Sequence, residues 1–331
     1  MSIIIDAQNL CKEFRVARQR SGRFSGLRSL LAREYNTKVA IRDLSLQIAA
    51  GELVGYIGPN GAGKSTTIKM LTGILVPTAG HLQVRGLVPY RQRVQYARQI
   101  GVVFGQRTQL WWDLPTIESL ELLRYMYGMG EAAYRRNLAR LTELLELGPF
   151  LPTPVRQLSL GQRMRADLAA ALLHDPAILY LDEPTVGLDV VAKQRIREFI
   201  REINRERGVT VILTTHDMQD VEKLCNRTIL IDGGSLVYDG PLAALRERYG
   251  THRTLVIDLE GEGAPPPEVQ GAVRIRSEGN RHWLRFDRRD VTASELIARV
   301  NAQCSVRDLT VEEPETEAII RRIYQEGRAA L

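Results

Sequence analysis

The nine residues GPNGAGKST, Gly58 to Thr66, bring three glycines, one lysine and two hydroxyl side chains together directly after the apolar run LVGYI. They match the spacing G-x-x-x-x-G-K-[ST], and the helical stretch TTIKMLTGIL overlaps their end. Glycines allow backbone N–H groups to curl around phosphate oxygens, while a lysine and a helix N-terminus add positive charge. This order predicts a polyphosphate site rather than an ordinary glycine-rich turn. The residues expected to contact the nucleotide here are Gly58, Asn60, Gly61, Gly63, Lys64, Ser65 and Thr66.

A pair of acids ends the apolar run AILYLDEPT. Continuous apolar residues are typical of a buried parallel strand, and ligands of open α/β sheets bind at the carboxyl ends of such strands. Asp182 is then placed to hold Mg²⁺ with the Ser65 hydroxyl, and Glu183 to activate a water as general base. Alone, two acids after a strand would fit a surface turn as well. Beside a phosphate loop they predict Mg²⁺-dependent hydrolysis of a nucleotide.

Two further stretches carry polar groups that suit the same chemistry. LSLGQRMRADLAAALLHDP, between the two motifs, predicts a short polar loop that opens a helix with arginines on one face and alanines on the other. After the acids come GLD and VTVILTTHD, a strand that delivers His216 to the same sheet edge. A strand-end histidine followed by an aspartate is well placed for phosphate contact, and a histidine satisfied within the core is the alternative.

In this order, with Gln106 upstream in GVVFGQ, the motifs closely resemble those of the nucleotide-binding subunit of ATP-binding cassette (ABC) transporters. The resemblance implies an α/β fold of the P-loop NTPase class, with ATP and Mg²⁺ bound. It implies that Phe14 stacks on adenine, that Gln106 senses the γ-phosphate and contacts the membrane subunit, and that His216 binds the γ-phosphate. The implied signature loop contains Ser159, Gly161 and Gln162, and Asp189 is the D-loop residue. The expected catalytic residues are Lys64, Gln106, Glu183 and His216, and the expected metal ligands are Ser65, Gln106 and Asp182.

Some of these assignments have simpler alternatives. Phe14 could belong to the core, because adenine stacking needs only an aromatic ring. Gln106 could be a plain surface glutamine. The family's signature is usually LSGGQ, and here Leu160 replaces the first glycine. Because Ser159 and Gly161 remain, we expect the site to work, and the detailed conformation of the loop is what Leu160 puts in question.

The pattern of elements predicts two domains. Residues 1–245 alternate β-branched runs with helical stretches, which indicates an α/β ATP-binding domain, with a helical subdomain at about 107–175. Residues 246–331 contain the period-two runs TLVIDLE, AVRIRS and HWLRFD and the helical stretches TASELIARVNAQ and TEAIIRRIYQ. They predict a small C-terminal α+β accessory domain.

Composition favours a soluble globular chain. Its longest apolar runs are strand-sized, so the sequence predicts neither a membrane span nor a signal peptide, and we expect the chain in the cytosol. By resemblance it would lie peripherally on the cytoplasmic side of the cell membrane. Cys11, Cys225 and Cys304 form no CxxC pair, which argues against a disulfide framework or a zinc site.

The resemblance also implies partners. In this family the signature loop closes the ATP site of a second cassette across a head-to-tail dimer. Both half-sites look intact, so a homodimer suffices chemically, and a heterodimer stays open. Membrane permease subunits would be separate chains. No nucleic acid is expected, because no basic stripe interleaved with aromatics accompanies the net charge of +6.

A single cassette followed by a small α+β domain, together with the stretch FGQRTQLWWDLP, resembles the exporter branch called ABC-2, the drug-resistance and sodium-extrusion type. An importer ATPase is the first alternative. A soluble ABC ATPase acting on ribosomes or DNA is the second, although this chain has neither two cassettes nor a long coiled coil. A GTPase is disfavoured because no NKxD motif is present.

Two segments carry open alternatives. Trp111 and Trp112, just after the Q-loop, either dock a membrane subunit or pack within the domain. The insertion at residues 15–35 has six arginines between Arg15 and Arg33 without one acid. It is expected to be a solvated loop with a small helix over its own domain, or a contact with the anionic membrane or a membrane subunit.

Overall fold

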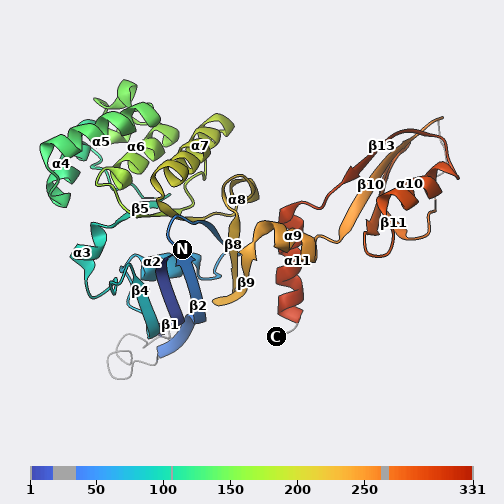
Figure 1. Ribbon diagram of the computed structural model, residues 1–331, viewed down its shortest axis with the longest axis horizontal. Coiled ribbons are helices and arrows are strands. Elements are labelled where there is room, and N and C mark those ends of the chain that lie inside the picture. Colours follow the sequence, from blue (N-terminus) through green and yellow to red (C-terminus); the bar gives the residue numbers. More distant parts are fainter. Residues whose placement is uncertain (1, 18–34, 106, 262–267, 330–331) are drawn as a thin grey trace, which may run out of the picture. The chain divides into compact units, whose positions relative to one another are not determined.

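The computed structural model describes residues 2–17, 35–105, 107–261 and 268–329 (Figure 1). The chain divides into two compact units, Met1–Asp239 and Gly240–Leu331. The division falls a few residues before the expected boundary at 245. The reason is that α9 (Leu242–Tyr249) packs against α11 (Thr316–Ala329), and Arg246 Nε donates to Thr316 Oγ1 at 2.9 Å.

A six-stranded sheet in the order β5-β6-β7-β3-β8-β9 forms the centre of the first unit. Its strands are β3 (Leu53–Ile57), β5 (Ile100–Phe104), β6 (Ile178–Asp182), β7 (Thr210–Thr214), β8 (Arg227–Asp232) and β9 (Ser235–Pro241). The pairs β5/β6, β6/β7, β7/β3 and β3/β8 are parallel. Side chains of β7 are buried on both faces, which explains its continuous apolar sequence. Because β6, β7 and β3 are adjacent and parallel, the loops that follow them lie next to one another at the carboxyl ends of the strands.

A second, antiparallel sheet in the order β2-β1-β4 completes this part of the unit. Its strands are β1 (Ile3–Ala17), β2 (Tyr35–Ala49) and β4 (Ala79–Val84). Inward side chains such as Ile5 and Leu46 share one apolar core with Tyr56 and Tyr180 of the central sheet. Helix α2 (Lys64–Leu71) joins that core through Ile68, and the short α3 (Arg93–Ala97) contributes Tyr96.

The helical subdomain contains α4 (Thr116–Tyr127), α5 (Glu131–Leu144) and α6 (Leu160–Leu172), coloured green in Figure 1. The alanine face of α6 is buried as predicted, with Ala166, Ala169 and Ala170 fully inaccessible. After β6 the chain forms α7 (Val190–Arg207), and after β7 it forms α8 (Met218–Leu224).

The second unit contains the four-stranded antiparallel sheet β11-β12-β10-β13. The strands are β10 (His252–Leu259), β11 (Ala272–Glu278), β12 (Arg281–Asp287) and β13 (Val306–Glu312). Helix α10 (Ala293–Asn301) inserts Leu296 and Val300 against Leu255, Ile257 and Leu284 of this sheet. The predicted period-two alternation is confirmed for β12, in which every second residue is buried. It is wrong for β10, which buries Leu255, Val256 and Ile257 in succession, and for the edge strand β11, where Val273 and Ile275 are exposed.

Two sequence interpretations fall outside the described residues: the basic segment at 18–34 and the role of Gln106. Within the described ranges, no helix is both long enough and apolar enough to cross a bilayer. Cys225 is buried, and burial raises the pKa of its thiol, so it behaves as a packing residue, as expected.

A buried carboxylate fastens α6 to the segment that follows β5. Asp167 is 5% exposed, and its Oδ1 accepts from Thr108 Oγ1 at 2.7 Å and from the backbone N–H of Gln109 at 3.2 Å. Burial raises the pKa of Asp167 to about 6, and the hydrogen bonds and the charge of Arg163 oppose this rise. The folded chain therefore holds this proton more tightly than the unfolded chain. Stability falls as pH rises through the interval from about 4 to 6.

Asp167→Asn removes this titration, so its effect on stability should depend on pH. As pH falls from 7 to 5, wild type should gain roughly 1 kcal/mol of unfolding free energy relative to the variant. Urea unfolding in a Trp283→Phe background measures this, because fluorescence then comes only from Trp111 and Trp112, close in sequence to Thr108. The prediction is contradicted if the unfolding free energy of wild type relative to Asp167→Asn stays constant over this pH range, or increases toward high pH.

Candidate active site

The phosphate loop leaves β3 and ends where α2 begins. Gly63 is the N-cap residue of α2, with φ of 108°, a conformation that disfavours other residues. A Cβ on Gly63 would lie 2.5 Å from Ile41 Cδ1, and one on Gly58 would lie 2.6 Å from the carbonyl oxygen of Ile231. Close packing of the backbone, together with the left-handed turn at Gly63, therefore requires glycine at both positions.

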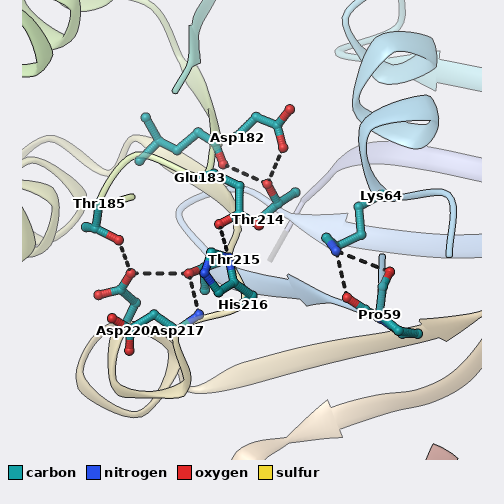
Figure 2. A network of polar contacts seen from close by, with 12 residues as sticks. Pro59, Lys64, Asp182, Glu183, Thr185, Thr214, Thr215, His216, Asp217 and Asp220 are labelled. Atoms are coloured by element: carbon teal, nitrogen blue, oxygen red, sulfur yellow. Dashed lines mark hydrogen bonds and ion pairs between the residues drawn. The ribbon is translucent and has the colours of Figure 1, made fainter. Parts of the chain in front are cut away.

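The lysine of this loop lies folded over it. Lys64 is 8% exposed, and its ammonium donates to the carbonyl oxygen of Gly58 at 2.6 Å and to that of Pro59 at 3.4 Å (Figure 2). Ser65, next in sequence, is exposed at the first turn of α2. The loop thus presents backbone N–H groups, the Lys64 ammonium and the exposed Ser65 hydroxyl at the sheet edge. This set of donors is suited to phosphate.

Below the loop, Thr67 and Tyr56 form a support that the sequence analysis missed. Thr67 Oγ1 donates to the carbonyl oxygen of Gly63 at 3.2 Å, and Tyr56 OH donates to Thr67 Oγ1 at 3.1 Å. Both side chains are buried, and burial raises the pKa of Tyr56. The apolar context of Tyr56 gave no signal for this role, since a tyrosine in a buried strand is ordinarily a packing residue.

The two acids occupy the adjoining strand end. Asp182 is half-buried and accepts from Thr214 Oγ1 of β7 at 2.5 Å. Glu183 follows with φ of 58°, a left-handed conformation that is uncommon for a non-glycine residue. Its backbone N–H donates to the carbonyl oxygen of Thr214 at 3.0 Å. The turn at Glu183 is therefore held to β7, and it directs consecutive side chains to separate positions.

His216 meets Glu183 at this edge. Its Nδ1 lies 2.7 Å from Glu183 Oε2, and their side chains are 67% and 24% exposed (Figure 2). The alternative of a histidine satisfied inside the core is therefore wrong, because the strand ends before His216 and leaves the ring open to solvent. The contact orients the imidazole through Nδ1, and Nε2 takes no part in it.

The signature loop lies at the start of α6. Ser159 is the N-cap residue, its Oγ accepts from the backbone N–H of Gln162 at 3.2 Å, and Gln162 Oε1 accepts from the N–H of Ser159 at 2.9 Å. The serine O–H stays available to donate outward. A Cβ on Gly187 would lie 2.9 Å from Leu160 Cδ2. The glycine at position 187 of the facing loop therefore leaves the space that the Leu160 side chain occupies.

The D-loop faces the signature loop within the same unit. Asp189 is the N-cap residue of α7, and its Oδ1 accepts from Ala192 N–H at 2.8 Å. A cavity of about 360 Å³ lies between the two loops, lined by residues that include Gly161, Leu188 and Asp189. Apart from Phe14 on β1 and Gln106, which is not among the described residues, the predicted site residues thus fall into two groups, one at the strand ends and one at this cavity.

Three aromatic predictions have mixed outcomes. Phe14 on β1 is half-buried, with the ammonium of Lys12 5.2 Å from its ring centroid, and it does not belong to the described buried core, so the core alternative is not supported. Trp111 and Trp112 are 38% and 50% exposed, and the Arg163 guanidinium lies 5.7 Å from the Trp112 ring. Intradomain packing therefore covers only part of each indole.

Known proteins are similar to this chain in sequence. The family model described as ABC transporter matches residues 41–186. The ABC transporter ATP-binding protein NatA of Bacillus subtilis is 36% identical over 208 residues, which cover 63% of this chain and 84% of that protein. Nod factor export ATP-binding protein I of Paraburkholderia xenovorans is 40% identical over 214 residues, 64% and 69% of the two chains. Methionine import ATP-binding protein MetN of Latilactobacillus sakei is 36% identical over 254 residues, 73% and 71%.

Solved structures agree. A dimeric ATP-binding cassette in a post-hydrolysis state, bound to ADP and Pi, has a TM-score of 0.59 and 26% identity and covers 72% of this chain and 98% of that one. The match to NatA extends over most of that protein, and residues 41–186, which the family model matches, contain both the phosphate loop and the strand-end acids. The chain therefore belongs to the ABC transporter family, in which it is an ATP-binding and ATP-hydrolysing subunit.

Proposed function

We propose that this chain powers an exporter of the ABC-2 type from the cytoplasmic side of the membrane, with Mg²⁺ as cofactor. The observation that carries the hydrolytic part is the 2.7 Å contact between His216 and Glu183 beside the phosphate loop. The exporter part is supported by the similarity to the Nod factor export protein. We assign ATP binding to residues 1–245 and an accessory role to residues 246–331.

An importer ATPase is the second candidate, and the similarity to the methionine import protein favours it. That protein matches over a longer part of this chain, at lower identity than the export protein. The two candidates share the same hydrolytic chemistry. They differ in the membrane subunits that the chain would serve, so the direction of cargo movement in a reconstituted complex separates them.

The residues present fit a nucleotide-bound Mg²⁺. Ser65 offers an exposed hydroxyl, and Asp182 offers a half-buried carboxylate whose Oδ1 already accepts from Thr214. Hard oxygen donors of this kind are those that Mg²⁺ prefers, and Gln106 is the third proposed ligand. When bound, the ion would neutralise charge that develops on the phosphates.

The remaining roles belong to the chain's own groups. Lys64 would exchange its contacts with loop carbonyls for the phosphates, which is favourable because a charge-assisted hydrogen bond to phosphate is stronger. Glu183 would accept a proton from the attacking water. His216, held through Nδ1, would present Nε2 to the γ-phosphate. Phe14, which is half-buried, would stack on adenine.

Glu183→Gln tests the general-base assignment. The amide retains the shape of the side chain but cannot take a proton, so turnover should fall roughly 10²-fold or more. ATP binding should persist, and an ATP-bound dimer should accumulate on a sizing column. Turnover equal to that of wild type would overturn the assignment. Lys64→Ala serves as the control that loses nucleotide binding together with turnover.

The proposed dimer is a head-to-tail homodimer in which one chain's signature loop meets the ATP held by the other. Ser159 supports this, because it is exposed at a helix N-terminus and has its O–H free to donate outward. The cavity between Ser159 and Asp189 is open to an incoming partner. The solved cassette bound to ADP and Pi, 98% of whose chain is matched, is a dimer.

Mixing two inactive variants tests this geometry. In a dimer of one Lys64→Ala chain and one Ser159→Arg chain, both lesions fall in the same composite site and the other site is unmutated. ATP-driven dimerisation and about half of the per-dimer turnover should return, since one of two sites works. A mixture that behaves no better than either variant alone would exclude a composite site.

Membrane permease subunits are the other proposed partners, with Trp111 and Trp112 at the docking surface. An exposed indole beside an arginine is typical of the anchors that dominate interface energies. The backbone here is firmly held, because Arg156 N–H donates to the Trp112 carbonyl oxygen at 3.0 Å. The surface is therefore preorganised for a partner.

Trp112→Ala should weaken binding to co-expressed permease subunits roughly 10- to 100-fold, because an interface anchor is lost. The ATPase activity of the detergent-free chain should stay unchanged. Ile275→Ala is the control, since Ile275 is 48% exposed and lies on β11, outside both this segment and residues 15–35. Retention of the variant on permease-containing membranes at the wild-type level would place the docking surface elsewhere.

A further inference from the structure

A buried charged cluster lies directly behind the contact between Glu183 and His216. At its centre is Asp220 of α8, which is fully buried, and against it lies Arg197 of α7, 4% exposed. Nε and one terminal nitrogen of Arg197 each lie 2.5 Å from Asp220 Oδ1. We call Thr185, Arg197, Thr215, Asp217 and Asp220 the Asp220 cluster.

The second oxygen of Asp220 binds the two loops that carry the catalytic pair. Thr185 Oγ1 donates to Asp220 Oδ2 through a short hydrogen bond, and Thr215 Oγ1 donates to the same oxygen at 3.3 Å (Figure 2). Thr185 is two residues after Glu183, with Pro184 between them, and Thr215 immediately precedes His216. One carboxylate thus ties the chain just beyond Glu183 to the chain just before His216.

The other side of His216 is held as well. The N–H of Asp217 donates to Thr215 Oγ1 at 2.9 Å, and Lys193 of α7 donates to Asp217 Oδ2 at 2.7 Å. Although burial raises the pKa of Asp217, the hydrogen bond and charge of Lys193 bring it below its ordinary value, so this carboxylate stays ionised. Lys193 and Arg197 lie one turn apart on α7, the helix that begins at the D-loop.

The energetics of this cluster argue against a purely stabilising role. A buried ion pair loses much of its attraction to desolvation, and apolar residues of similar volume are often as stable. Glu183, in contrast, needs support, because a residue with φ of 58° holds its conformation only where its surroundings fix it. The contact between Glu183 and His216 depends on this conformation of Glu183. The Asp220 cluster holds the chain on both sides of that contact, at Thr185 and at Thr215.

We propose that Asp220 and Arg197 are positioning residues that set the geometry of Glu183 against His216 and connect it to the D-loop helix. The proposal rests on the hydrolytic function proposed above. Asp220 is fully buried, and it acts through the two loops that it joins. A change in α7 that moves Arg197 is then felt at Glu183.

Asp220→Asn tests this, because it keeps the shape of the side chain and removes the charge that gathers the loops. Turnover per folded molecule should fall roughly 10- to 100-fold, the scale of a misplaced catalytic group, while KM for ATP stays within about twofold. The fraction folded is measured by circular dichroism on each preparation. Asp175→Asn is the matched control. Asp175 pairs with Arg207 at the C-terminal end of α7, ten positions after Arg197, and its φ of 60° suits asparagine.

The double variant Glu183→Gln/Asp220→Asn separates positioning from general damage. If Asp220 acts through Glu183, the double variant should have the same single-turnover rate as Glu183→Gln alone. Should Asp220→Asn fail to fold, Thr185→Val is judged by the same criteria, since it removes one hydroxyl donor at constant charge and shape.

The proposal is overturned if Asp220→Asn leaves turnover per folded molecule unchanged, or raises KM without lowering kcat. It is also overturned if adding Asp220→Asn to Glu183→Gln lowers the rate as much as Asp220→Asn alone lowers it in the wild type. These outcomes are distinct from failure of the proposed function. In that case Glu183→Gln itself would retain wild-type turnover, whatever Asp220→Asn does.

Discussion

Strands β6, β7 and β3 lie side by side and run in the same direction, so the three segments that leave their carboxyl ends start next to one another. One of these segments is the phosphate loop, one carries Asp182 and Glu183, and one carries His216. Glu183 and His216, 33 positions apart in the chain, are thereby brought within hydrogen-bonding distance, and the phosphate loop leaves the same edge of the sheet. The chemistry depends on this register, because shifting one strand by a residue would turn its terminal side chain away from the edge.

Close approach of backbone segments keeps this edge compact. Gly105, after β5, donates its N–H to the Asp182 carbonyl oxygen at 2.8 Å, and a Cβ there would lie 2.4 Å from the carbonyl oxygen of Glu183. Gly63 meets Ala40 and Ile41 in the same way. Only glycine permits such distances, so the loops at this edge have little freedom to rearrange without moving their neighbours.

The sequence was sufficient for the parts of the site that follow from local pattern. The loop from Gly58 to Thr66 and the acids after β6 could be predicted because each depends on a short stretch and its adjoining strand. Asp220 and Arg197 could not, because their pairing joins two helices and no local pattern marks a buried ion pair. The same holds for Asp167 and Thr108, which lie 59 positions apart.

Boundaries were harder for a related reason. The run LAALRERY has no feature that assigns it to either neighbour, and only its packing against α11 places α9 with the second unit. His216 shows the converse limit, since VTVILTTHD predicted a strand but not the point at which burial stops. The last buried residue of this run is Thr215, and the next side chain, His216, is open to solvent.

The two buried aspartates show how partner chemistry decides what a buried carboxylate does. Asp167 has neutral donors as its nearest partners, so burial outweighs them and its pKa lies within reach of ordinary pH. Asp220 has an arginine and two hydroxyls on its two oxygens, so it is tied to three neighbouring segments. A carboxylate of the first kind gives a contact whose strength changes with protonation. One of the second kind gives a fixed point, and the fixed point lies behind the residues that must hold their geometry.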